Sequence, residues 1–429
     1  MNKKFLLAIS SLVVFITTAC AQKLVPVDKA WSNNSVNAVV FRQNSLVTQA
    51  DTQFIAYYTT EGKLALGKRN INDDKFTINQ TDFSGNVKDA HNCISIMVDG
   101  DGYLHVSWDH HGHPLRYAKS VAPYSLELGP KTEMTGQNET NVTYPQFFKM
   151  PNGNLIFMFR DGQSGQGNLV LNSYDVKTQK WSQIQSNLID GEGQRNAYWQ
   201  ACLDHKGVIH VSWVWRETWD VSTNHDMCYA RSKDGGVTWE NSKGEAYRLP
   251  INAASAEYAA KIPQKSELIN QTSMTTNGNG EPVIASYWRE QDSDIPQFHI
   301  ISLVDGKWIV KDLGFRKEAF SLSGGGTKRI PISRPQIVAK STKKGTVYYL
   351  VFRDEERGAK VSVAELKPSG KVKITDLTDF TVGSWEPSFD TELWKDKGML
   401  QIFVQRVEQV DAEGTADFEP QMVYVLEVK

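Results

Sequence analysis

The feature that most constrains the fold of this 429-residue chain is a repeated unit, a glycine followed by a strand of alternating apolar residues. Six units begin at glycines 102, 153, 207, 280, 345 and 398, and residues 53–58 supply a seventh strand without the glycine. Successive glycines lie 51, 54, 73, 65 and 53 residues apart, a spacing typical of β-propeller blades. Each unit also has an upstream and a downstream strand. We therefore predict an all-β, single-domain, seven-bladed β-propeller, because blades of this size must stack to bury their faces.

The two ends of the chain are expected to meet in one blade. A strand over residues 36–41 is predicted to complete the last blade, which ends with residues 422–426. Residues 232–239 match the S-x-D-x-G-x-T-W Asp-box of sialidase-like propellers, with Asp234 in a tight turn and Trp239 packed beneath it. We interpret this motif as a marker of the fold.

The first 21 residues are predicted to be a cleaved export signal. Lys3 and Lys4 precede an apolar stretch over residues 5–16 and then small residues. Cleavage either leaves Cys20 as the lipidated first residue of a lipoprotein or falls before Gln22. The propeller would then occupy residues 22–429, in a protein that is secreted, periplasmic or anchored in the outer membrane of a bacterium.

Composition limits the partners that are expected. The net charge of −2 and the isoelectric point near 6.5 argue against nucleic-acid binding, which usually requires a basic face. Three cysteines beyond Cys20 imply no disulfide framework. No later segment has the roughly 18 unbroken apolar residues of a membrane span.

Polar residues of neighbouring blades are expected at one rim of the propeller. In an antiparallel hairpin, the start of the first strand and the end of the second share an edge. By this rule, blades two to four place a common set of residues there: His91, Asn92, His110, His111, His113, Tyr144, Arg160, Tyr198, Trp215, Arg216 and His225.

Other residues of the same types have structural explanations. His105 and His210 lie inside alternating strands, so we expect them to be core histidines. The strand-end arginines Arg216, Arg289, Arg353 and Arg406 are candidates for pairing with neighbouring acids: Glu217, Glu290 and Asp354.

Metal binding is an alternative function for some of these residues. The histidine cluster with His225-x-x-Cys228 offers imidazole and thiolate ligands for zinc, but the spacing matches no strong zinc pattern. Calcium near residues 99–101 is a second possibility, although D-x-D before glycine is also an ordinary turn. The metal therefore stays unassigned.

A His, a Tyr and an Arg without an evident pair of carboxylates suit β-elimination at a uronic acid better than glycoside hydrolysis. Elimination requires a cation to neutralise the C6 carboxylate and stabilise an enolate-like intermediate, a task that a bidentate arginine performs. A base must take the C5 proton and an acid must protonate the leaving O4. Hydrolysis normally needs two carboxyl groups that flank the bond.

Five segments, residues 89–92, 99–106, 109–117, 143–148 and 159–165, resemble BNR-repeat proteins that include the ulvan lyases of polysaccharide lyase families 24 and 25. The resemblance implies a propeller that cleaves ulvan, a sulfated glycan of rhamnose and uronic acid. The product would carry an unsaturated uronyl end, and the chemistry would require no cofactor. The zinc ligands of some ulvan lyases have no clear counterparts here.

The family pattern also implies roles for individual residues. Two histidines about twenty residues apart correspond to His91 and His111, and a tyrosine followed sixteen residues later by an arginine corresponds to Tyr144 and Arg160. His91 and Tyr144 would be the acid/base pair, with the base depending on whether the uronate is glucuronic or iduronic. Arg160, assisted by His111, would neutralise the carboxylate. The expected substrate-binding residues are Asn92, Tyr198, Trp215, Arg216 and His225.

Two other functions remain open at this point. One is an α-L-rhamnosidase acting on rhamnose-glucuronate glycans with the same scaffold. The other is a non-catalytic glycan-binding propeller, in which tryptophans at the mouth would stack on sugars: Trp108, Trp199, Trp215 and Trp288. A sialidase is disfavoured, because its arginine triad and Tyr/Glu pair cannot be assigned.

Overall fold

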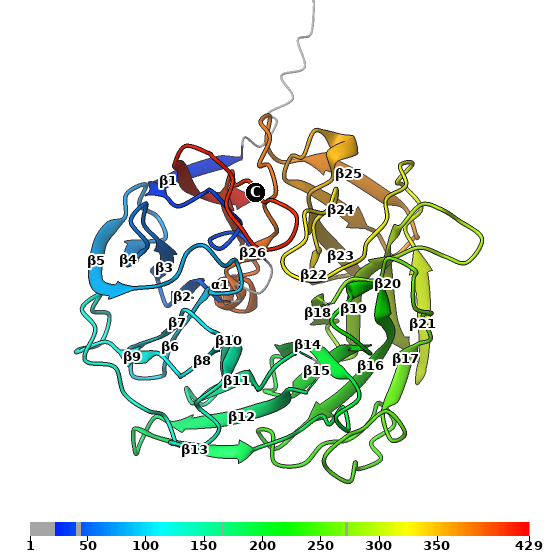
Figure 1. Ribbon diagram of the computed structural model, residues 1–429, viewed down its shortest axis with the longest axis horizontal. Coiled ribbons are helices and arrows are strands. Elements are labelled where there is room, and N and C mark those ends of the chain that lie inside the picture. The colour runs from blue at the N-terminus through cyan, green and yellow to red at the C-terminus, as the bar shows by residue number, and fades with distance from the viewer. Residues whose placement is uncertain (1–21, 40–43, 165, 271–272, 429) are drawn as a thin grey trace, which may run out of the picture.

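The computed structural model describes residues 22–39, 44–164, 166–270 and 273–428. Seven small sheets surround a central axis like the blades of a propeller, which confirms the predicted fold (Figure 1). The predicted export signal, including Cys20, lies outside the described residues. Among the residues described, no helix has the length and apolar character needed to cross a membrane.

Blades one to four follow one another along the chain. Blade one contains β2 (Leu46–Gln49), β3 (Thr52–Tyr58), β4 (Lys63–Asn70) and β5 (Thr77–Ser84). Blade two contains β6 (Ile94–Val98), β7 (Leu104–Trp108) and β9 (Tyr117–Lys119). Blade three contains β10 (Val142–Lys149), β11 (Leu155–Asp161), β12 (Asn168–Asp175) and β13 (Lys180–Gln185), joined by β8 (His111–His113). Blade four contains β14 (Asn196–Leu203), β15 (Ile209–Arg216), β16 (Asn224–Ser232) and β17 (Glu257–Ala260), with a short 3₁₀ helix at Val221–Thr223.

Blades five to seven complete the ring. Blade five contains β18 (Ser273–Thr276), β19 (Pro282–Trp288), β20 (Gln297–Val304) and β21 (Lys307–Asp312). Blade six contains β22 (Gln336–Thr342), β23 (Gly345–Phe352), β24 (Ser362–Leu366) and β25 (Val372–Asp376), with a 3₁₀ helix at Glu355–Arg357. Blade seven contains β26 (Ser388–Phe389), the helix α1 (Thr391–Lys397), β27 (Leu400–Gln405), β28 (Gln421–Val428) and β1 (Lys23–Ala30).

The ring closes where β1 pairs with β28, so the first described strand is the outermost strand of the last blade. The predicted closing strand over residues 36–41 is wrong. Residues 36–39 form turns, and residues 40 and 41 lie outside the described part. Val36 and Val39 are nevertheless buried, in two different clusters of the core. Their apolar character therefore reflects packing between blades and not strand pairing.

The core histidines and the Asp-box are placed as predicted. The ring of His105 lies between Asp99 Oδ2, at 3.0 Å, and the hydroxyl of Tyr117, at 2.8 Å. Asp234 accepts a bond of 2.9 Å from the backbone N–H of Thr238, and Trp239 is 1% exposed. Because this turn follows the end of β16, it lies on the face opposite the start of that strand.

A buried carboxylate joins blade seven to blade one. Asp390 caps α1 by accepting from the backbone N–H of Leu393 at 2.9 Å. It also accepts from the backbone N–H of Thr48 at 3.0 Å and from Nε2 of Gln53 at 2.9 Å. Burial raises the pKa of Asp390 to about 6 in spite of these bonds. The link supports the same junction that β1 and β28 close.

We expect Asp390→Ala to lower the free energy of unfolding by about 2 kcal/mol, because it removes a helix cap and leaves buried donors of blade one without an acceptor. Urea unfolding checks this. The matched control is Asp396→Ala, which removes an exposed carboxylate from the same helix and should change the stability by less than about 0.5 kcal/mol. Equal stability of the two variants would contradict the assignment.

Candidate active site

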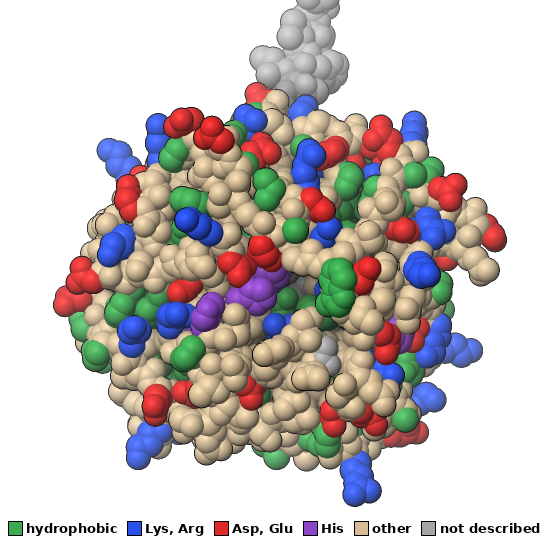
Figure 2. Space-filling model, viewed as in Figure 1, with side chains coloured by type: hydrophobic (Ala, Val, Ile, Leu, Met, Phe, Trp, Pro, Cys, Tyr) green, Lys and Arg blue, Asp and Glu red, His purple; other side chains and the backbone are tan. Residues whose placement is uncertain are grey.

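A pocket lies on the face where the inner strands of the blades begin, and histidines mark one side of the hollow in Figure 2. Its cavity volume is about 210 Å³. Six of the predicted site residues line it: His91, His111, Tyr144, Arg160, Tyr198 and Arg216.

Strand register brings His111 and Arg160 to the same row of the sheet. In β8, His111 lies opposite Thr143 of β10, and Thr143 lies opposite Arg160 of β11. The Thr143 hydroxyl also accepts a bond of 2.8 Å from the backbone N–H of Gly112. The short strand β8 therefore carries the histidine cluster of blade two to the edge of blade three.

A β-bulge directs Tyr144 into the pocket. The register of β10 shifts between Thr143 and Gln146, and Tyr144 has a φ of 57° in the left-handed region. Non-glycine residues seldom adopt this conformation, and it is concentrated at functional sites. The tyrosine ring is 6% exposed, and its centre lies 6.0 Å from that of His91.

Arg160 is a buried cation with unpaired donors. Its side chain lies against the ring of Tyr144, with Cζ 5.0 Å from the ring centre, and the residue is 4% exposed. Within the described structure, Nε and Nη1 have no hydrogen-bond partner. Gly167 permits this position, because a Cβ there would lie 2.5 Å from Cγ and Cδ of Arg160. An unpaired buried guanidinium is costly unless it binds an anion.

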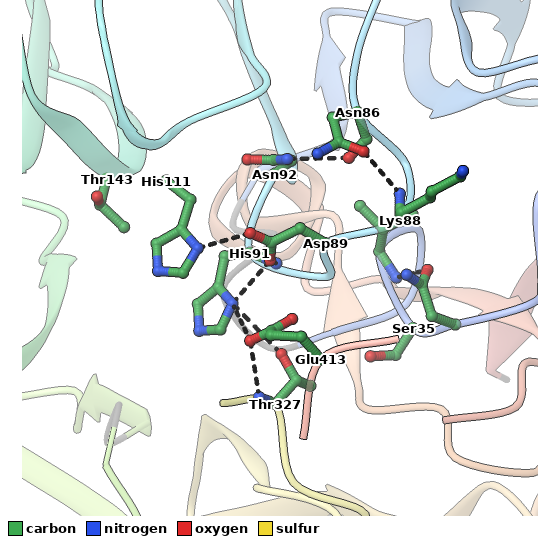
Figure 3. A network of polar contacts seen from close by, with 12 residues as sticks. Ser35, Asn86, Lys88, Asp89, His91, Asn92, His111, Thr143, Thr327 and Glu413 are labelled. Atoms are coloured by element: carbon green, nitrogen blue, oxygen red, sulfur yellow. Dashed lines mark hydrogen bonds and ion pairs between the residues drawn. The ribbon is translucent and has the colours of Figure 1, made fainter. Parts of the chain in front are cut away.

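One carboxylate holds both catalytic-site histidines, as Figure 3 shows. Asp89 Oδ1 lies 2.9 Å from Nδ1 of His91, and Asp89 Oδ2 lies 2.6 Å from Nδ1 of His111. The two imidazole rings stack, with their centres 4.1 Å apart and their planes 15° apart. Asp89 therefore sets the orientation of both rings.

The charge of His91 follows from its neighbours. Burial alone would lower the pKa of His91, but the carboxylates of Asp89 and Glu413 raise it to about 9. Glu413 Oε1 lies 3.3 Å from the same Nδ1. The bonds from the two histidines also hold the pKa of Asp89 below its usual range, although burial opposes this. At neutral pH, His91 is an imidazolium that can donate a proton.

A second pair of an arginine and a tyrosine, Arg216 and Tyr198, also lines the pocket. Cζ of Arg216 lies 5.2 Å from the ring centre of Tyr198, and the Tyr198 hydroxyl lies 2.9 Å from the hydroxyl of Ser164. Burial would raise the pKa of Tyr198, but Arg216 and Arg160 lower it, with the help of Ser164. The pocket is therefore electropositive around its phenols.

Asp89, His91 and His111 also form a group with metal-ligand chemistry, since one ligand atom of each lies within 4.8 Å of the others. The hydrogen bonds that Asp89 accepts from both Nδ1 atoms account for this grouping. The other metal candidates have structural explanations. Cys228 is buried in the blade core, and Asp99 accepts backbone N–H bonds of its own turn from Asp101 and Tyr103.

Three predicted substrate-binding residues lie outside the pocket. Asn92 is fully buried, and its side chain donates to the backbone carbonyl of Asn86. Trp215 is fully buried in the core of blade four. His225 Nε2 lies 2.7 Å from Glu217 Oε1, and the pKa of His225 is raised by Asp226 and Glu217 against the effect of burial. These placements correct the prediction, which used position along a strand without knowing which face each side chain takes.

The remaining rim predictions are also corrected in part. Trp108, Trp199 and Trp288 are at most 4% exposed, so they pack between strands and do not ring the mouth. Arg406 Nη2 lies 3.9 Å from Glu408 Oε1, but no ion pair joins Arg216, Arg289 or Arg353 to the adjacent acid in the described structure. Instead, Arg289 binds Glu267 at 2.7 Å, and Arg353 donates to the backbone carbonyls of Trp385, Pro331 and Ile330.

Several pocket residues were missed in the sequence. Trp219, at 69% exposure, is the tryptophan that lines the mouth, and it lies in a loop just after a predicted strand. Lys328 and Glu413 come from long loops of blades six and seven, where no motif marks them. The sequence could have indicated Asp89, because it lies two residues before His91 in a segment that carries the family resemblance.

The fold places this chain in the class of seven-bladed β-propellers. A family model described as BNR repeat-containing family member matches residues 52–316, and the chain belongs to that family. It is 27% identical over 235 residues to the long isoform of ulvan lyase from Alteromonas sp., covering 41% of this chain and 23% of the relative. The short isoform from Alteromonas sp. (strain LOR) is 26% identical over 238 residues, covering 41% of this chain and 44% of the relative. These matches span less than half the length of either relative.

Solved structures show the same fold. The crystal structure of the polysaccharide lyase Uly1 matches 92% of this chain and 91% of its own, with a TM-score of 0.66 and 17% identity. A family 25 ulvan lyase bound to -[GlcA(1-4)Rha3S]- matches 84% of this chain and 96% of its own, with a TM-score of 0.58 and 14% identity.

The network around Asp89 predicts a pH-dependent stability. Since the pKa of His91 in the folded protein is about 9, above the value near 6.5 of an unfolded histidine, its ion pairs stabilise the fold fully below about pH 6.5. That contribution is lost as the pH rises through about 9. Between pH 7 and pH 10 the wild type should therefore lose on the order of 2 kcal/mol more stability than Asp89→Asn.

Denaturant unfolding at the two pH values measures the difference, and an NMR titration of the His91 ring should show a lower pKa in Asp89→Asn. In a His91→Gln background, Asp89→Asn should no longer change how steeply the stability depends on pH. If Asp89→Asn alters this dependence equally with and without His91, the pairing of Asp89 with His91 is contradicted.

Proposed function

We propose that the protein is a polysaccharide lyase that cleaves ulvan by β-elimination at the uronic acid. The observation that carries the proposal is the buried Arg160 guanidinium, with two donors unpaired, beside Tyr144 and His91 in one pocket. Such a cation suits the carboxylate of a uronic acid. The likeness to ulvan lyases in sequence and fold supports the choice of substrate.

The reaction needs three groups. The C5–H bond breaks and its proton passes to a base; the electron pair forms the C4=C5 double bond; and the C4–O4 bond breaks while O4 receives a proton from an acid. Arg160, assisted by His111, would neutralise the C6 carboxylate, which makes the C5 proton more acidic and stabilises the enolate-like intermediate.

The charges around the site support one assignment of the acid and the base. Asp89 and Glu413 keep His91 protonated at neutral pH, so we assign it as the acid that protonates O4. Tyr144 is then the base that takes the C5 proton. Its ring lies against the Arg160 guanidinium, in the same pocket as His91.

The carboxylates near the pocket do not favour a glycosidase. Asp89 and Glu413 both interact with Nδ1 of His91, so each already serves to hold that ring. A hydrolase would need two carboxyl groups directed at the scissile bond.

We expect ulvan to yield products with the ultraviolet absorbance of an unsaturated uronate. Tyr144→Phe and Arg160→Ala should each lower kcat by at least about 100-fold, because each removes a group used in the elimination. Tyr144→Phe should still bind ulvan with nearly the wild-type Kd, measured by titration calorimetry.

The matched control is Arg195→Ala. Arg195 binds Glu217 outside the pocket, so its loss should leave kcat within about threefold of wild type. Release of free rhamnose without unsaturated ends would overturn the lyase in favour of the hydrolase. Binding without any product would favour a lectin.

The assignment of His91 as acid also predicts a pH profile. We expect kcat/KM to fall as the pH rises through about 9, because deprotonation removes the proton donor. Asp89→Asn should move this fall to lower pH, since it removes the carboxylate that most favours the imidazolium. A pH–rate profile on ulvan measures both. If Asp89→Asn does not shift the fall of kcat/KM at high pH, the role of His91 as the acid is contradicted.

A further inference from the structure

A loop of blade six lies across the mouth of the pocket. Residues 324–328, called here the bridging loop, come from the long connection between β21 and β22, and four of them line the pocket: Gly325, Gly326, Thr327 and Lys328. The hydroxyl of Thr327 lies 3.3 Å from Nδ1 of His91, so the loop reaches the catalytic histidine itself (Figure 3).

One end of the bridging loop is fastened to blade four. The backbone N–H of Val221 donates to the carbonyl of Gly324 at 2.8 Å, and the backbone N–H of Gly324 donates to Asp220 Oδ1 at 2.8 Å. Gly325 packs on Trp219, because a Cβ there would lie 3.0 Å from the indole ring. The two loops are therefore in direct contact at this side of the pocket.

The other end is fastened to blade seven. The backbone N–H of Thr327 donates to Glu413 Oε1 at 3.0 Å, and Nζ of Lys328 binds Asp411 Oδ2 at 2.6 Å. Gly326 has a φ of 73°, and a Cβ there would lie 3.1 Å from Cα of Ala412. Only glycine allows the two loops to approach this closely.

The wall continues from blade seven to blade two. The backbone N–H of Ala416 donates to the carbonyl of Asn33 at 2.7 Å. Nδ2 of Asn34 donates to the carbonyl of Val87 at 2.8 Å, in the loop that leads to Asp89 and His91. Hydrogen bonds thus connect the loops of blades four, six, seven and two around the pocket.

Blade three contributes Tyr144, Arg160 and His111 to the pocket, and its edge is accessible there: the His111 side chain is 35% exposed, and Ser164 is exposed as well. A polymer that is cut in mid-chain must leave a site on two sides, whereas hydrogen-bonded loops stand on the sides of blades four, six, seven and two.

We infer that the enzyme acts from a chain end, and that the wall built on the bridging loop determines this mode. The inference rests on the proposed lyase function and deepens it. The terminal sugar units of an acidic, uronate-containing glycan would enter over blade three, and the wall would stop the chain beyond the pocket. Each elimination would then release a short product of constant size.

The first test compares polymer size with the number of bonds cut. At equal ultraviolet absorbance, size-exclusion chromatography should show short products from the earliest time, with the remaining ulvan close to its starting size. A rapid several-fold fall in polymer size at low conversion would overturn the inference while leaving the lyase function intact.

Asp411→Ala should loosen the wall, because it removes the partner of Lys328 without touching the catalytic groups. This variant should cut in mid-chain more often and lower the polymer size several-fold more than wild type at equal conversion. The control is Asp417→Ala in the same loop, which has no described contact with the bridging loop. Identical product sizes from the two variants would count against the wall.

A binding test separates the inference from catalysis. The Tyr144→Phe variant can be titrated with intact ulvan and with the same mass of ulvan shortened by mild acid. If the pocket takes chain ends, the number of sites per gram should rise in proportion to the number of ends. An unchanged number would overturn end binding whatever the chemistry, and no binding to either sample would overturn the proposed function together with the inference.

Discussion

The pairing of β1 with β28 is the interaction on which the rest of the structure depends. It joins segments about 400 residues apart, Lys23 opposite Glu427 and Ala30 opposite Gln421, and makes a closed ring out of a row of sheets. A closed ring fixes the distance of every blade from the axis. The pocket needs that constraint, because its residues come from six blades.

Within that rigid ring, the site is built from local departures from regular structure. Tyr144 occupies a bulge with a left-handed backbone, and β8 leaves blade two to pair with blade three. Both departures are costly for a strand, and both are held by the regular sheet around them. The result is that Tyr144, Arg160 and His111 are each positioned by a strand of the blade three sheet.

Much of the fold could be predicted from the sequence, because a glycine and an alternating strand recur with every blade. The closing strand was misplaced because residues 36–39 have the apolar composition of a strand but bury it in turns. For the site, strand ends gave a wider set of rim residues, and the family resemblance singled out His91, His111, Tyr144 and Arg160, which the structure brings into one pocket. Position along a strand could not show on which face Trp215 and His225 fall, because one residue of register reverses the direction of a side chain.

What the sequence could not indicate is the meeting of distant loops. Glu413 and Thr327 approach His91 from segments more than 230 residues away, and neither belongs to a repeated motif. Their positions follow only from the lengths of the loops and the curvature of the ring. The raised pKa of His91 depends in part on such a contact, that with Glu413.

Trp219 has a practical consequence. The chain contains twelve tryptophans, and this is the one whose side chain is largely exposed, at 69%. It lies at the mouth of the pocket, against Gly325, while the others are buried or half-buried. Its indole is therefore a natural optical reporter. A sugar that enters the pocket would displace water from this ring and alter its fluorescence, whereas the emission of the buried tryptophans would change little.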